Sequence, residues 1–317
     1  MPFMPRLPSV YVISLTPFAE DESLDERAFR AHLQRMKAAG IGVYVGGAGS
    51  GEAYTLSPAE MRRVLEIAVE ELQGAVPVRA MGVEPRTAKE MITFGKLCAA
   101  VGVDAMQVYS LDIGHVGRPA GEEIERYLDD VLSSLEVPAV ISTHFSVGYF
   151  VPVAIMARIC DRYDHVIGIN CTNPDINYLT QLCTIIDERV EIHTGLMTQA
   201  LGAFAVGASG YLTTEANVVP RLCVEVVERY GAGDLSGMMA AYGRLLRFSD
   251  KLLGDGGSIR ATKATLSLMG LPGGIPRRPR LPLADAATTE RLQQMIDELA
   301  LRETELSDSP TRPRPVS

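Results

Sequence analysis

The feature that most constrains this chain is a regular alternation of short β-branched runs with longer segments of helical periodicity. Eight such pairs follow one another between Val10 and Tyr230, with short connections. Repeated strand–helix–strand units favour parallel strands with right-handed crossovers, and eight of them close most simply into a barrel. A doubly wound open sheet is the rival, but the segment after the first strand, Leu15–Ala19, is not a glycine-rich phosphate loop. The sequence therefore predicts an α/β protein with a (β/α)8 barrel.

The predicted elements divide the chain into three parts. The eight strands are predicted at Val10–Leu15, Gly42–Gly46, Val76–Met81, Ala105–Tyr109, Val137–Ser142, Val166–Asn170, Val190–His193 and Tyr211–Thr214. After the eighth helix the periodicity is purely helical, over Met238–Leu253, Ile259–Met269 and Ala287–Glu303. We expect the barrel at residues 1–230, a C-terminal helical extension packed on it at 231–303, and a disordered Pro/Ser/Thr-rich tail at 304–317.

Charge and cysteine usage narrow the class of protein. The formal net charge of −9 argues against nucleic acid or an anionic membrane as a partner. No apolar run approaches the ~18 residues of a membrane span, and Met1–Pro8 lacks the apolar core of a signal peptide. The five cysteines include no CxxC pair, which indicates reduced thiols and a cytoplasmic location.

Polar residues follow several predicted strands, and in such a barrel the carboxyl ends of the strands carry the functional site. Asn170 ends the apolar sixth strand, just before a turn at Asn173-Pro174. Ser142 and His144 are two residues apart on the fifth strand, so both side chains are expected to point the same way. His144 has two interpretations: a general acid or base at the barrel mouth, or a loop residue bonded to its neighbours.

Four stretches together resemble the pyruvate-dependent aldolase and dehydratase family of dihydrodipicolinate synthase and N-acetylneuraminate lyase. They are Leu15–Phe18, Gly47–Ser57 with its Gly-Ser-Gly-Glu run, Gly210–Pro220, and the Lys-x-x-Leu-x-x-x-Gly helix beginning at Lys263. The resemblance covers about 260 residues and implies the same barrel. It also implies a substrate-binding loop at Gly49 and Ser50, although a glycine-rich turn leading into a helix cap is the alternative there. Thr214 is a further candidate binding residue, whereas Glu52 is expected to be structural.

The same resemblance shows departures at the positions that carry the family's chemistry. Family members form a Schiff base between pyruvate and a lysine at the end of the sixth strand, where this chain has Asn170. An amide nitrogen is not a nucleophile, because its lone pair is delocalised into the carbonyl. Ser142 stands where the family has a proton-relaying tyrosine, and the following arginine is absent. The five lysines are expected on helices rather than at strand ends: Lys37, Lys89, Lys96, Lys251 and Lys263.

The remaining polar residues suggest which reactions are possible without a Schiff-base lysine. The Asn170 amide NH2 is expected to donate to a substrate carbonyl, doing by hydrogen bond what an iminium would do by charge. His193 ends the seventh strand near the mouth or caps it, and Cys171 is expected to point away from Asn170. His144, His193, Cys171 and Glu215 would form a metal site on paper, but none has local metal-ligand spacing, so no metal is predicted. His32 and His165 are expected on the surface.

Two hypotheses from different classes follow. The first is a lyase-family enzyme that acts on a small carbonyl- or carboxylate-bearing substrate without a Schiff base and without a cofactor, with Ser142, His144 and Asn170 as its catalytic residues. The second is a non-catalytic relative that binds a metabolite or serves as a partner subunit. The resemblance implies a homotetramer or homodimer in either case.

Overall fold

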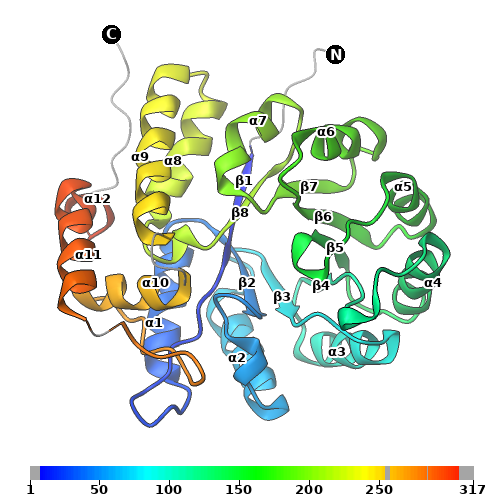
Figure 1. Cartoon of the computed structure of the whole chain (residues 1–317), viewed down its shortest axis with the longest axis horizontal. Helices are drawn as coiled ribbons and strands as arrows, with labels where there is room; N and C mark the ends of the chain where they lie inside the picture. Colours follow the sequence, from blue (N-terminus) through cyan, green and yellow to red (C-terminus); the bar gives the residue numbers. More distant parts are fainter. Residues whose placement is uncertain (1–7, 254–257, 284, 307–317) are drawn as a thin grey trace.

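The structure is a computed structural model that describes residues 8–253, 258–283 and 285–306. Eight parallel strands form a closed barrel in sequence order, and β1 pairs with β8 to close it (Figure 1). The strands are β1 Ser9–Ile13, β2 Gly42–Gly47, β3 Val78–Gly82, β4 Ala105–Val108, β5 Ala139–His144, β6 Val166–Thr172, β7 Glu191–Thr194 and β8 Gly210–Thr213. The predicted (β/α)8 barrel is confirmed.

An outer ring of helices surrounds the strands: α1 Glu26–Ala38, α2 Pro58–Leu72, α3 Ala88–Val101, α4 Gly121–Leu132, α5 Val153–Arg162, α6 Ile176–Ile185, α7 Ala200–Ala205 and α8 Pro220–Gly231. Local sequence sets their ends. Ser57 and Glu60 form a capping box, in which the Ser57 hydroxyl accepts from the Glu60 N–H and the Glu60 carboxylate accepts from the Ser57 N–H. Gly40, after α1, has a φ of +70°, a conformation in which L side chains are strained. Between β7 and β8 the helical segment begins as a 3-10 turn, Met197–Gln199, and continues as the short α7.

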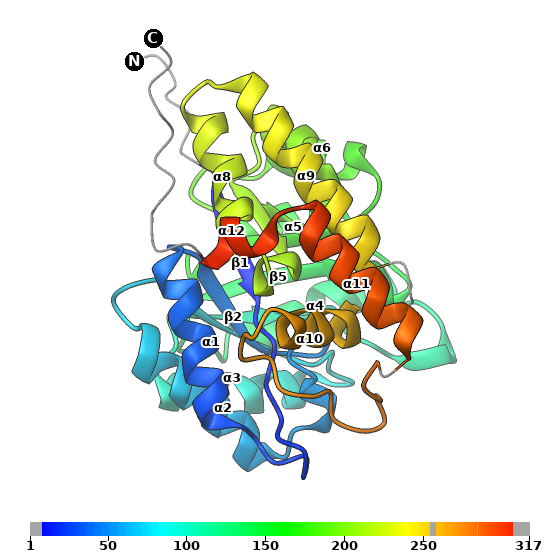
Figure 2. The same cartoon turned by 90° about the vertical axis from the view of Figure 1, so that its left-hand side faces the viewer.

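Four helices follow the barrel and pack beside α8 and α1: α9 Leu235–Leu253, α10 Ser258–Leu268, α11 Ala286–Glu298 and α12 Leu301–Leu306 (Figures 1 and 2). The single helix expected at 287–303 is therefore two helices, because Ala300 adopts a φ of +49° that interrupts the first. Residues 304–306 of the expected tail belong to α12, and 307–317 lie outside the described residues. Within the described ranges no helix has the length and apolar character required to cross a bilayer.

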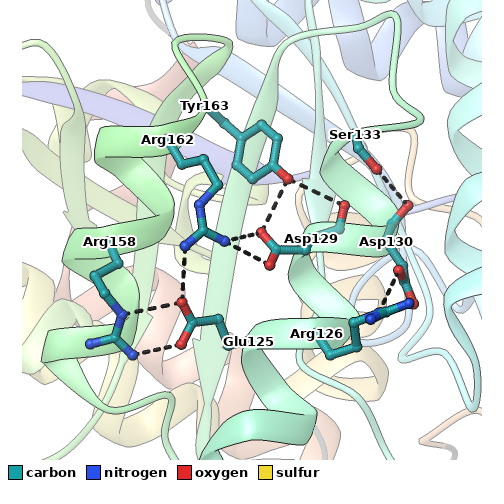
Figure 3. Close-up of polar contacts among 8 residues, drawn as sticks. All are labelled: Glu125, Arg126, Asp129, Asp130, Ser133, Arg158, Arg162 and Tyr163. Atoms are coloured by element: carbon teal, nitrogen blue, oxygen red, sulfur yellow. Dashed lines mark hydrogen bonds and ion pairs between the residues drawn. The ribbon is translucent and has the colours of Figure 1, made fainter.

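A network of exposed charges joins two helices of the outer ring (Figure 3). Arg158 and Arg162 of α5 both pair with Glu125 of α4, at 2.6 and 3.2 Å, and Arg162 also pairs with Asp129 at 2.5 Å. The Tyr163 hydroxyl donates to the same Asp129 carboxylate at 3.1 Å. Such solvated pairs fix how neighbouring helices align but contribute little to stability.

The inner face of the barrel is unusually polar. Interiors of these barrels are normally filled by branched aliphatic side chains. Here the described strands place a set of polar and charged residues inside: Tyr11, Tyr44, Arg79, Gln107, Asn170, Glu191 and His193. Arg79 is only 5% exposed, lies 4.3 Å from the centroid of the Tyr11 ring, and pairs with Glu191 at 2.8 Å. Its charge is thus compensated within the barrel.

Candidate functional site

Ser142 and Asn170 lie side by side on neighbouring strands, because β5 and β6 pair in parallel with these two residues in register. Both are nearly inaccessible to solvent, at 3% and 2% exposed. The Ser110 hydroxyl donates to the Ser142 carbonyl at 3.0 Å, which ties the end of β4 to the same place. The sequence named both residues as catalytic candidates, and the register makes them neighbours on adjacent strands.

The amide of Asn170 is held differently from the sequence-based expectation. Its Nδ2 donates to Gln107 Oε1 at 2.6 Å, so the NH2 group bonds within the barrel rather than facing a ligand. The atom without a partner is Oδ1, which is buried and accepts no hydrogen bond from any described residue. The expected role as an NH2 donor to a substrate carbonyl is corrected accordingly: the group that Asn170 offers is an acceptor.

Tyr44 and Arg79 extend this network toward the other end of the barrel. The Tyr44 hydroxyl accepts from Arg79 Nη1 at 3.2 Å, and Tyr44 is fully buried. Burial raises the pKa of Tyr44, whereas the Arg79 guanidinium and hydrogen bonds from Arg79 and Asn170 oppose the rise. A continuous path therefore runs from Glu191 through Arg79 and Tyr44 to Asn170.

His144 lies at the rim, at the end of β5, and bonds to its own loop. Its Nδ1 accepts from the backbone N–H of Ser146 at 3.0 Å, and its ring stacks on Phe145 with 4.4 Å between centroids. Burial lowers the pKa of His144, and Glu84 opposes the shift. Because Nδ1 is an acceptor, the neutral ring carries its proton on Nε2 and can donate from that atom.

The loop after β2 has a fixed shape around Gly49 and Ser50. Ser50 is 3% exposed, while Gly49 is exposed. A Cβ on Gly51 would lie 2.7 Å from the Gly47 carbonyl oxygen, so only glycine fits there. Glu52, at a φ of +51°, accepts from the Arg277 N–H at 3.0 Å and pairs with Lys263 at 2.5 Å. Glu52 is therefore structural, as expected.

The other candidate residues are bonded elsewhere. Thr214 donates to Glu215 at 3.3 Å, and the second Glu215 oxygen accepts from Ser249 at 2.6 Å. His193 is fully buried inside the barrel, with Nε2 2.7 Å from the Ser9 hydroxyl at the start of β1. Burial raises the pKa of the Cys171 thiol to about 12, so this thiol is protonated at neutral pH. His144, His193, Cys171 and Glu215 thus have separate partners, and the described residues contain no group of three or more His, Cys, Asp or Glu placed to hold a metal ion.

The sequence model of the Dihydrodipicolinate synthetase family matches residues 7–299. The chain belongs to this family.

Its relatives span almost the whole chain. The 4-hydroxy-tetrahydrodipicolinate synthase of Acidiphilium cryptum is 30% identical, over 88% of this chain and 94% of its own. The Methanopyrus kandleri enzyme of the same name is 28% identical, over 90% and 94%. A prophage protein of this family from E. coli K12, solved in complex with pyruvate, has a TM-score of 0.85 at 20% identity, covering 93% of this chain and 99% of its own. At that identity the likeness shows a shared fold.

The lysines of this dihydrodipicolinate synthetase family member lie away from the end of β6. Lys37, Lys89 and Lys96 are exposed, and Lys251 pairs with Glu298. Lys263 of α10 is 1% exposed, and burial lowers its pKa to about 8 despite the opposing charge of Glu52. Its Nζ also donates to the Thr16 and Ile275 carbonyls at 2.8 and 2.7 Å, so the ammonium is saturated with acceptors. This bonding pattern is that of a structural cation.

Sequence reasoning missed five residues of the barrel interior: Tyr11, Tyr44, Arg79, Gln107 and Glu191. The signal for two of them was present, because Arg79 and Gln107 interrupt the otherwise apolar runs Val76–Met81 and Ala105–Tyr109. A charged residue in a buried parallel strand needs a partner inside the barrel. His32 was also misplaced: it is fully buried, with Nε2 3.0 Å from Asn217 Oδ1. His165 is half-buried rather than exposed.

Proposed function

We propose that this chain is a lyase-type enzyme that acts on a small carbonyl- or carboxylate-bearing molecule without forming a Schiff base. The observation that carries the proposal is Asn170, a buried amide at the end of β6 with one unpartnered oxygen beside Ser142. The bonding of Lys263 supports it, because that ammonium already meets three oxygen acceptors.

The proposal gives each candidate residue a role. Ser142 and Asn170 bind the reacting oxygen of the substrate, and the Gly49–Ser50 loop binds its carboxylate through N–H and hydroxyl groups. His144 donates a proton from Nε2, since Ser146 occupies Nδ1. Thr214 borders the substrate from the β8 end. Catalysis by positioned hydrogen bonds and proton transfer requires no cofactor in this scheme.

Borohydride trapping with pyruvate tests the proposal. We expect no covalent adduct on the parent chain by intact-protein mass spectrometry, whereas Asn170→Lys, which places an amine at the end of β6, serves as the matched positive control. An adduct on any lysine of the parent would refute the proposal.

The non-catalytic alternative is separated by a second measurement. Where a hydroxy or oxo acid is turned over, Ser50→Ala and His144→Ala should each lower the rate by about 100-fold if those residues act as proposed. Turnover that is unchanged in both variants would refute these two roles. Binding of an acid without turnover of any of them would favour a metabolite-binding protein instead.

A further inference from the structure

The inner face of the barrel holds two neighbouring polar groups that the chain itself leaves unused. Asn170 Oδ1 is buried and has no hydrogen-bond partner among the described residues. Ser142, its register partner on β5, donates from its hydroxyl to no described residue. Adjacent parallel strands lie about 4.8 Å apart, so one small group can reach both side chains. A buried acceptor without a donor is uncommon, and a ligand is one physical explanation for it.

The rest of the network fixes which atom Asn170 presents. Gln107 Oε1 accepts from Asn170 Nδ2 at 2.6 Å, so the amide nitrogen faces β4. On the other side, Tyr44 receives a hydrogen bond from Arg79 Nη1, and a guanidinium can only donate. Arg79 is in turn held by Glu191 at 2.8 Å. These contacts hold the amide nitrogen of Asn170 and leave its oxygen as the atom without a partner, on a residue whose neighbour on β5 is Ser142.

The chemistry of the two groups selects the ligand. A ligand hydroxyl can donate its proton to Asn170 Oδ1 and accept the Ser142 proton at the same time. A carbonyl oxygen can accept from Ser142, but it would place a second acceptor against Asn170 Oδ1. We propose that the Ser142–Asn170 pair is a specificity site for a hydroxyl-bearing small carboxylate, and that it disfavours the corresponding oxo acid.

This inference takes only one element from the proposed function, namely that the Gly49–Ser50 loop binds the carboxylate of the ligand. Gln107, Tyr44 and Arg79 are positioning residues in it, because they act through the orientation of Asn170. It sets this chain apart from the E. coli relative that was solved with pyruvate, an oxo acid.

Four three-carbon acids that differ only at C2 provide the test: lactate, pyruvate, alanine and propionate. Affinities are compared by ligand-observed NMR titration on the full chain. We expect lactate to bind about tenfold or more tightly than pyruvate and propionate, since each of these leaves the Asn170 oxygen without a donor. The carbonyl of pyruvate should give it no advantage over propionate.

Two variants connect the preference to the network. Asn170→Leu should abolish the lactate preference. Gln107→Leu frees the amide to turn its NH2 toward the ligand, so the affinity ratio of lactate to pyruvate should fall toward one. The inference would be overturned if the parent chain bound all four acids equally, preferred pyruvate or alanine, or bound none of them. Equal binding would mean that water, rather than a ligand, satisfies the Asn170 oxygen. A chain that prefers lactate but turns over nothing refutes the proposed function and leaves this inference standing.

Discussion

Single buried residues set the pH response of this molecule, and His32 is the clearest case. It is a buried residue of α1, and its Nε2 bonds to Asn217, whose side chain also accepts from the Leu15 N–H and donates to the Ile13 and Thr214 carbonyls. Burial, reinforced by the nearby Arg35 charge, lowers the pKa of His32 to about 3. The neutral imidazole is therefore part of the contact between α1, β1 and the β8 turn.

The pH dependence of stability follows from the difference between the folded and unfolded pKa of His32. Above about pH 6.5 the imidazole is neutral in both states. Below that pH it is protonated in the unfolded chain but stays neutral in the folded chain, so the free energy of unfolding falls. Between pH 7 and pH 5 this should cost about 2 kcal/mol. We expect His32→Gln, which keeps a donor toward Asn217, to lose less stability over that range in urea unfolding. The exposed His115→Gln is the control, and parallel pH profiles for parent and His32→Gln would contradict the prediction.

Some side-chain positions inside the barrel could not be predicted from the sequence. Side chains alternate along a strand, so Arg79 or Tyr44 can be assigned to the inside only when the face of that strand is known. His32 could have been found, because it falls on the stripe of Phe29, Leu33 and Met36 at helical spacing. The orientation of the Asn170 amide depends on Gln107, 63 positions away in sequence, and no local pattern encodes it.

At the scale of elements, the strand–helix alternation predicted the barrel because it reflects which faces are buried. Buried parallel strands are apolar on both faces, whereas the helices that cover them are apolar on one face only. The break between α11 and α12 escaped the sequence, since the residue that turns there is Ala300 rather than glycine or proline. The segment after α10 returns to the barrel, where Ile275 bridges to Phe18 and Arg277 bonds to Glu60 at 2.7 Å.

The Glu52–Lys263 pair is a buried polar link between that extension and the barrel, and both side chains are at most 1% exposed. Removing one partner leaves a buried charge, so Glu52→Gln and Lys263→Met should each cost about 3–5 kcal/mol. The double variant should cost clearly less than the sum, because neither charge remains. Chemical unfolding measures the cycle. Glu125→Gln, in the exposed α4–α5 network of Figure 3, is the matched control and should have a far smaller effect. Additive losses at Glu52 and Lys263 would show that the pair does not act as a unit.

At the scale of the whole molecule, apolar side chains stay exposed on two separate faces. One is the barrel rim, where Tyr54, Val83 and Phe145 follow β2, β3 and β5 at 48, 41 and 52% exposed. The other is the start of α9, where Leu235 and Met239 are 59 and 62% exposed. Where such side chains form a contiguous patch, another molecule commonly covers the surface. The homodimer or homotetramer expected for this chain would account for at least one of them.

The rim is the face that we expect to be covered first, because its exposed side chains extend from the loops that surround the candidate site. Sedimentation at micromolar concentration should give a mass of two or four times 34.3 kDa. The double variant Val83→Lys/Phe145→Lys should shift the population to a smaller species, because buried lysines are disfavoured at the centre of an interface. Leu235→Lys/Met239→Lys makes the same chemical change on α9 and should retain the rim-mediated pair. A monomeric parent, or dissociation by the α9 variant alone, would contradict the assignment and direct attention to the helical extension as the assembly surface.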